Sequence, residues 1–193
     1  MTNAELAILS LVAEQPRHGY DIERVIEERG MRDWTEVGFS SIYYLLSKLE
    51  REGLVKGCLT TARGRGPARK VYRITAAGLK AFRSGVLQAL SLPIRSYPPL
   101  QLGLACLPGI APERALAALR QRRDALAANM AQLRESWQAQ RPLPYFVDAM
   151  FDHSVSMIQA ELHWVERFIT TMEAQNDQVG PAQGTEASVC AEE

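Results

Sequence analysis

The residues best suited to chemistry form a short basic stretch, Arg63-Gly-Arg-Gly-Pro-Ala-Arg-Lys70. Arginine and lysine side chains neutralise phosphate groups, and glycine lets a backbone approach them closely. The stretch belongs to a wider positive zone, because residues 53–112 contain nine basic residues and no acidic one. We therefore predict a phosphate-contacting loop that uses Arg63, Arg65, Arg69 and Lys70. For the loop taken alone, a solvated hairpin tip is the alternative.

A second group of candidate residues lies on the helix predicted for residues 40–53. At 100° per residue, its apolar side chains fall on one side, namely Ile42, Leu45, Leu46 and Leu49. The opposite side and its edge carry hydroxyl, aromatic and basic groups: Ser40, Ser41, Tyr43, Tyr44, Ser47, Lys48 and Arg51. Small side chains let a helix enter the major groove, where hydroxyls contact base edges and basic groups contact phosphates. A solvated face with the tyrosines packed sideways is the alternative.

These two groups need elements that hold them together. The sequence predicts helices at about 3–13, 18–30 and 40–53, then two short strands around the basic loop, and a helix from Thr75 to about Leu90. Asn3, Ser40 and Thr75 are the expected N-caps. This order is typical of a winged helix-turn-helix domain, whose third helix enters the major groove and whose hairpin follows the backbone. Arg17 and His18, at the start of the second helix, are expected to hold a phosphate.

The remaining residues predict three further segments. Residues 91–112 form a proline-rich connector with a short helix, residues 113–175 form two antiparallel helices, and residues 176–193 form a disordered tail. The fold class is thus mainly α with a small β-hairpin wing, in which residues 1–90 are the DNA-binding domain and residues 113–175 the dimerisation domain.

The last helix carries two apolar faces, so it needs two partners. The helix at 113–138 can cover one face through Leu119, Leu126, Met130, Leu133 and Trp137. The remaining face is expected to be covered by another chain or by the winged domain, and we infer a homodimer. Its predicted interface is a seam with 4-3 spacing: Phe151, Val155, Ile158, Leu162, Val165, Ile169 and Met172. The other face is interpreted either as interface core or as a pocket for a flat apolar ligand: Phe146, Met150, His153, Met157 and Trp164.

Several short motifs resemble the PadR family of bacterial transcriptional regulators. They are His18-Gly-Tyr-Asp-Ile22, Ser41-Ile-Tyr43, Leu46-Ser-Lys-Leu-Glu-Arg-Glu-Gly-Leu-Val55 and Gly64-Arg-Gly-Pro-Ala-Arg-Lys-Val-Tyr-Arg-Ile-Thr75. The loop departs from the family's usual Gly-Arg-Pro-Arg-Lys by the interposed Gly66 and Ala68. The second half is similar to the longer members, which have a helical C-terminal domain. The resemblance implies a DNA-binding transcriptional regulator, and it supports the interpretation of the second apolar face as a pocket for a small aromatic ligand that releases the protein from DNA. A homodimer with two-fold symmetry predicts a pseudo-palindromic operator, and repression requires only that such a dimer block polymerase.

Other functional classes find little support in the sequence. It contains no P-loop, dinucleotide fingerprint, zinc-protease or nucleophile-elbow motif, so no enzyme, cofactor or metal site is predicted. Cys58, Cys106 and Cys190 are far apart and are expected to be reduced and inert. No apolar run approaches the roughly 18 residues of a membrane span, and no signal peptide is recognised, so we expect a cytoplasmic protein. A winged-helix module that binds protein instead of DNA is the alternative function.

Overall fold

The structure is a computed structural model that describes residues 1–35, 38, 41–60, 69–93 and 95–178, with the backbone alone at positions 33, 60, 69, 177 and 178. The chain divides into two compact units, residues 1–96 and 97–193. Within the described ranges, no helix is both long enough and apolar enough to cross a membrane.

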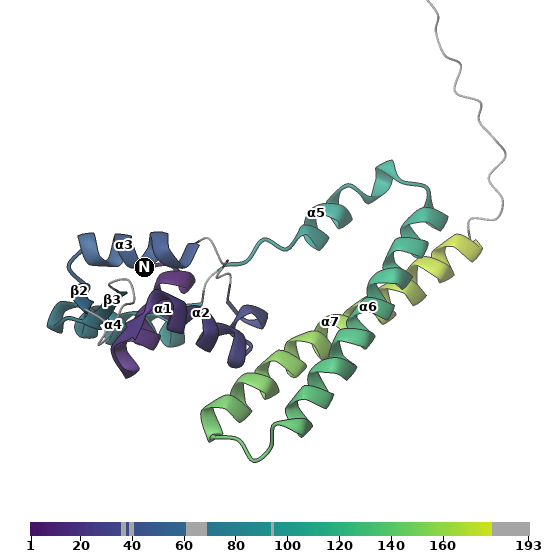
Figure 1. The fold of residues 1–193 in the computed structure, drawn as a ribbon. Helices are drawn as coiled ribbons and strands as arrows, with labels where there is room; N and C mark the ends of the chain where they lie inside the picture. The colour runs from purple at the N-terminus through teal and green to yellow at the C-terminus, as the bar shows by residue number, and fades with distance from the viewer. Residues whose placement is uncertain (36–37, 39–40, 61–68, 94, 179–193) are drawn as a thin grey trace, which may run out of the picture. The chain divides into compact units, whose positions relative to one another are not determined.

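The first unit is a helical domain with a small sheet (Figure 1). Its elements in chain order are α1 (Asn3–Glu14), β1 (Arg17–His18), α2 (Gly19–Glu28), the 3-10 turn η1 (Met31–Asp33), α3 (Ser41–Arg51), β2 (Val55–Thr60), β3 (Arg69–Ile74) and α4 (Ala76–Ser91). β3 lies between β1 and β2 and pairs antiparallel with both. The fold class predicted from the sequence is confirmed, but the short strand β1 was not predicted.

Local capping interactions explain where these helices begin. The predicted cap of α4 is confirmed, because Thr75 Oγ1 accepts a hydrogen bond from the Gly78 backbone N–H at 2.9 Å. The predicted cap of α1 is wrong by one position. Thr2 caps that helix in a reciprocal arrangement with Glu5, and Asn3 is the first helical residue.

The core of the first unit is formed by the apolar faces of α1, α2 and α3 together with the sheet. Among its fully buried side chains are Ile8, Leu9, Ile22, Ile26, Ile42, Leu46 and Leu49. α3 ends at Arg51, and the turn after it contains Gly53, whose φ of +72° favours glycine. The Leu54 N–H bonds to the Leu49 carbonyl across this turn. α4 then packs close to this turn: a Cβ at Gly78 would lie 1.9 Å from the Leu54 carbonyl oxygen. These contacts fix the turn between α3 and β2 against the start of α4.

The second unit contains α5 (Pro99–Ala105), the 3-10 turn η2 (Leu107–Gly109), α6 (Pro112–Ala139) and α7 (Tyr145–Gln178). α6 and α7 lie side by side as a long antiparallel hairpin (Figure 1). α7 extends through residues 176–178, where a disordered tail was expected, and residues 179–193 of that expected tail lie outside the described residues.

The α6–α7 hairpin uses the seam that the sequence assigned to a dimer. Val165 and Ile169 of α7 are buried against Leu116 and Leu119 of α6. Nearer the hairpin turn, the Phe151 ring stacks on Trp137 with ring centroids 6.0 Å apart. Four residues of the predicted seam, Phe151, Val165, Ile169 and Met172, thus pack within the chain. The assignment of the full seam (Phe151, Val155, Ile158, Leu162, Val165, Ile169 and Met172) to a dimer interface stays a prediction. The 4-3 spacing of the seam fits any helix that packs along it, including the neighbouring helix of the same chain.

Candidate DNA interface

The outward face of α3 is the best candidate for contact with nucleic acid. Tyr43 and Tyr44 are 54% and 64% exposed, and Ser47 and Arg51 are also exposed. Among the described residues, no side chain pairs with the Arg51 guanidinium. α3 thus offers hydroxyl groups and a cation on one face, while its apolar face is held in the core.

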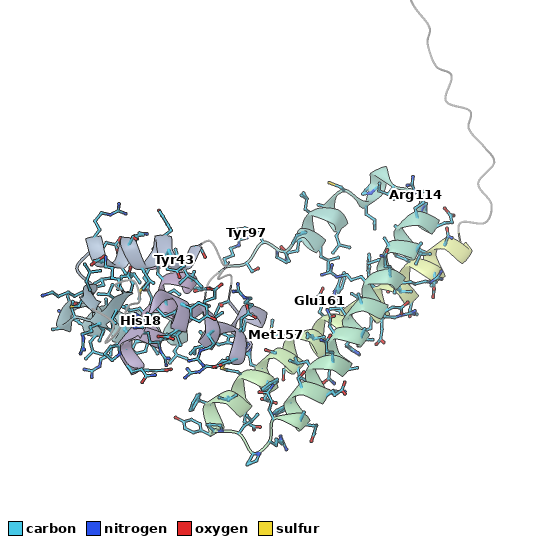
Figure 2. The ribbon with its side chains drawn as sticks, viewed as in Figure 1. His18, Tyr43, Tyr97, Arg114, Met157 and Glu161 are labelled. Atoms are coloured by element: carbon cyan, nitrogen blue, oxygen red, sulfur yellow. The ribbon has the colours of Figure 1, made fainter. Side chains whose placement is uncertain are left out.

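The start of α2 adds a residue that sequence reasoning missed. The Tyr43 ring lies against Gly19, since a Cβ at that glycine would be 2.5 Å from the ring carbon Cε1. Figure 2 labels Tyr43 and His18, on α3 and just before α2. Tyr20, the next residue of α2, is 68% exposed. The signal available in the sequence was an aromatic residue in the first turn of a mainly polar helix.

Arg17 has a structural role in place of the predicted phosphate contact. Its side chain is only 7% exposed, and Nε donates a hydrogen bond to the Leu11 carbonyl at 3.0 Å. Its Nη2 atom also pairs with Glu14 at 2.8 Å. The adjacent His18 places Nδ1 3.1 Å from the Lys70 carbonyl oxygen, which joins the start of α2 to β3. The guanidinium of Arg17 is occupied inside the fold, so we leave it out of the interface.

Lys48 is likewise engaged within the protein. Its Nζ forms an ion pair with the buried carboxylate of Glu5 on α1, and Glu52 lies 3.9 Å away. The hydrogen bond to Lys48 is the main cause that holds the pKa of Glu5 below its usual value, and the same bond raises the pKa of Lys48. Lys48 therefore positions α3 on α1.

The hairpin of β2 and β3, which we call the wing, is tied to α3 by another acidic residue. Glu50 accepts a hydrogen bond from Lys70 Nζ at 2.5 Å and one from the Gly57 backbone N–H at 3.1 Å. The bond from Lys70 lowers the pKa of Glu50 and raises the pKa of Lys70. Lys70 is thus paired, although the sequence assigned it to phosphate.

Several predicted contacts cannot be placed. Ser40, Arg63 and Arg65 lie outside the described residues, as does the side chain of Arg69. Ser41 is partly exposed and donates a hydrogen bond to the Gly38 carbonyl at 2.6 Å. Tyr43, Tyr44, Ser47 and Arg51 are exposed on α3, and Tyr20 is exposed beside Gly19, the residue of α2 that the Tyr43 ring approaches. We call Tyr20, Tyr43, Tyr44, Ser47 and Arg51 the reading surface.

The residues predicted as a ligand pocket form an exposed stripe on α7. Phe146, Met150 and Met157 are 57%, 39% and 60% exposed, and His153 is also exposed. Trp164 is partly buried and stacks on Phe168 with ring centroids 5.1 Å apart. We call Phe146, Met150, His153, Met157 and Trp164 the α7 stripe; Figure 2 labels Met157 within it. Among the described residues, no cluster of His, Cys, Asp and Glu could hold a metal ion.

Comparison with known proteins identifies the first unit. Residues 8–84 match the model of the transcriptional regulator PadR-like family. No curated protein matches the chain.

Solved structures resemble the chain along most of its length. The Bacillus subtilis PadR structure with operator DNA is 20% identical, covers 87% of this chain and 98% of its own, and has a TM-score of 0.70. The structure of the same protein with p-coumaric acid is 18% identical, covers 88% of this chain and 98% of its own, and has a TM-score of 0.71. The structure of a PadR-like regulator from Bacillus cereus is 19% identical, covers 90% of this chain and 100% of its own, and has a TM-score of 0.63. At these identities the likeness establishes the fold. Residues 8–84 are thus a domain of the transcriptional regulator PadR-like family, and the chain has the fold of PadR-type regulators over most of its length.

Proposed function

We propose that the protein is a sequence-specific DNA-binding transcriptional repressor. The observation that carries the proposal is the reading surface, which lies on a helix whose other face is buried. It presents exposed hydroxyl and aromatic groups together with Arg51, which has no partner among the described residues. Such a helix can enter the major groove and present donors and acceptors to base edges. Operator DNA in the B. subtilis PadR crystal supports this assignment.

The charge distribution favours DNA over a protein partner. Residues 53–112 contain nine basic and no acidic residues, so the wing and the helix after it have no acid of their own for neutralisation. A polyanion fits this surface, because the affinity of proteins for duplex DNA is dominated by phosphate neutralisation. The proposal requires no catalytic step, metal or cofactor.

We further propose a homodimer formed through the α7 stripe. α6 occupies the seam face of α7, so the stripe is the apolar face left exposed on this helix. Large apolar side chains repeated along a helix of 34 residues suit an isologous helix-to-helix contact. A two-fold dimer would present two copies of α3 to a pseudo-palindromic operator. Repression requires only that this dimer block access to the promoter.

A small aromatic effector is proposed for the same stripe, where two copies would enclose Met and aromatic side chains. The B. subtilis PadR crystal with p-coumaric acid supports this chemical class. Titration of the dimer with p-coumaric acid, followed by Trp164 fluorescence, tests it. The Trp164→Phe variant identifies the responding tryptophan, and an unchanged signal up to millimolar ligand would exclude this compound.

The DNA proposal is tested by titrating the protein into the DNA immediately upstream of its own coding sequence and into a scrambled duplex of the same length. We expect tight binding to the first that survives competition by the second. Equal binding to both would leave only electrostatic attraction and would call for selection of sites from genomic DNA. Failure to bind either at low salt would favour the protein-interaction module.

A pair of matched variants then locates the interface. Arg51→Gln on α3 should weaken binding to both duplexes and reduce the slope of log Kobs against log salt by about 0.9 for one lost phosphate contact. Arg134→Gln removes the same charge from an exposed position of α6, outside residues 53–112, and should leave the slope unchanged. Equal effects of the two variants would contradict the assignment of α3.

A further inference from the structure

The acidic residue Glu50 on α3 is unexpected in a helix proposed to approach a polyanion. A carboxylate beside phosphate is repelled, so an acid at this position weakens DNA binding unless a cation neutralises it. Glu50 belongs to the same helix as the exposed Tyr43, Tyr44 and Arg51, and it lies at the junction of α3 and the wing.

The two oxygens of Glu50 contact the two wing strands separately. Oε1 accepts the Gly57 backbone N–H of β2 at 3.1 Å, and Oε2 accepts Lys70 Nζ of β3 at 2.5 Å. Gly57 leaves room for this arrangement. A Cβ at position 57 would lie 2.0 Å from Lys70 Cε and 2.7 Å from Glu50 Oε1. One carboxylate therefore joins both strands of the wing to α3.

Lys70 is held at its backbone as well as its side chain. Its carbonyl oxygen lies 3.1 Å from His18 Nδ1, and its Nζ is 5.2 Å from the centroid of the Tyr72 ring. The pKa of Glu50 is lowered and that of Lys70 is raised, chiefly by their mutual hydrogen bond, so both groups stay charged near neutral pH. The side chains are 30% and 41% exposed, and such a pair contributes little to folding stability. What the pair changes is the position of the Lys70 ammonium, which is held on the Glu50 carboxylate.

We propose that Glu50 is a specificity-determining positioning residue, which fixes the wing against α3 and withholds the Lys70 ammonium from DNA phosphate. This inference rests on the proposed DNA binding. The pair removes one sequence-independent phosphate contact from the wing, which lowers affinity for all DNA. It also fixes the position of the wing relative to the reading surface, so the remaining contacts form together only on a matching site.

The experiment compares Glu50→Gln with wild type on the upstream duplex and its scrambled control over a series of salt concentrations. The glutamine oxygen can still accept the Gly57 N–H, but the charge that retains Lys70 is lost. We expect tighter binding to scrambled DNA, a salt slope steeper by about 0.9, and a smaller ratio of specific to non-specific affinity. The double variant Glu50→Gln/Lys70→Gln should return the slope to the wild-type value.

Glu52→Gln is the matched control, because it removes the same charge one residue beyond the end of α3. Glu52 lies 3.9 Å from Lys48, which remains paired with Glu5, so this variant releases no wing cation. An equal steepening in Glu52→Gln would reduce the effect to net charge and overturn the proposal. An unchanged or shallower slope in Glu50→Gln, with wild-type discrimination, would also overturn it.

Two further results separate the possible failures. Absence of wild-type binding to either duplex refutes the proposed function, and this inference with it, whereas normal wild-type binding leaves the variants to decide on Glu50 alone. Hydrogen exchange at the Gly57 amide provides a reading without DNA: exchange should quicken in Glu50→Ala and much less in Glu50→Gln. Equal protection of that amide in wild type and Glu50→Ala would contradict the contact on which the inference rests.

Discussion

At the scale of single residues, the basic side chains divide into those that hold the fold and those left for a ligand. Arg17 and Lys48 contact buried groups, whereas Arg51 is exposed and unpaired within the described chain. The sequence gives all three the same expected role, because a basic residue near a helix start or a polar face suits phosphate contact. The distinction depends on Leu11, Glu14 and Glu5, whose proximity comes from the packing of α1.

Replacement of Arg17 should therefore affect folding. In Arg17→Met the Leu11 carbonyl loses a buried donor, and we expect the free energy of unfolding to fall by about 1–3 kcal/mol. Urea denaturation followed by circular dichroism measures this change. Arg24→Met, which removes an exposed arginine paired with Glu28, should stay within about 0.5 kcal/mol of wild type. A small effect at position 17 with a loss of DNA affinity would restore the phosphate role.

Glu5 gives a pH dependence whose direction is fixed by its lowered pKa. A carboxyl whose pKa is lower in the folded state stabilises that state at pH values above its ordinary pKa of 4.5. This contribution is lost as the pH falls through the lowered pKa of the folded state. Thermal melting from neutral to acidic pH should therefore show a steeper acid loss in wild type than in Glu5→Gln. Parallel acid limbs in the two proteins would show that Glu5 titrates alike in both states.

At the scale of elements, spacing predicts helices well and their partners poorly. Thr75 caps α4 as predicted, and the apolar faces of α3 and α7 are where the sequence places them. The seam on α7 illustrates the limit, because apolar spacing says that a face is covered without saying by which helix. β1 was missed because two residues give no alternation pattern, and it forms only through pairing with Tyr72 and Val71.

An aspartate introduced on either face of α7 should have a different effect: on the buried face it should unfold the hairpin, and on the exposed face it should break the dimer. Val165→Asp places a carboxylate at a fully buried position and should unfold the α6–α7 hairpin, with a loss of helical circular dichroism. Met157→Asp lies on the exposed α7 stripe and should keep the helical signal while shifting the mass measured by light scattering from dimer to monomer. A Met157→Asp protein that remains dimeric would move the interface away from the stripe.

At the scale of the whole molecule, the residues that the structure describes form two hydrophobic cores, one in each unit. One is built from α1, α2, α3 and the sheet, and the other from α6 and α7 with Leu100. Proline positions and charge indicate the division from sequence alone, since both change near residues 91–112. What the sequence lacks is the pairing between distant residues, such as Glu5 with Lys48 and Glu50 with Lys70, which decides which charges remain for a ligand.

Separate cores should give separable unfolding. Val12→Ala and Val165→Ala remove the same atoms from fully buried positions, one in each core, at an expected cost of about 1–3 kcal/mol. Differential scanning calorimetry should show two transitions, with each variant lowering a different one. A single transition lowered equally by both substitutions would show that the two units unfold together.

The double role of Glu5 has an evolutionary consequence. Its carboxylate closes the cap of α1 through the Thr2 N–H and also holds Lys48 of α3. A substitution at position 5 therefore leaves a helix end and a lysine unsatisfied together, and no single change at position 48 repairs both. We expect positions 2, 5 and 48 to covary as a triplet among homologous sequences, with loss of the acid accompanied by loss of both the threonine and the lysine.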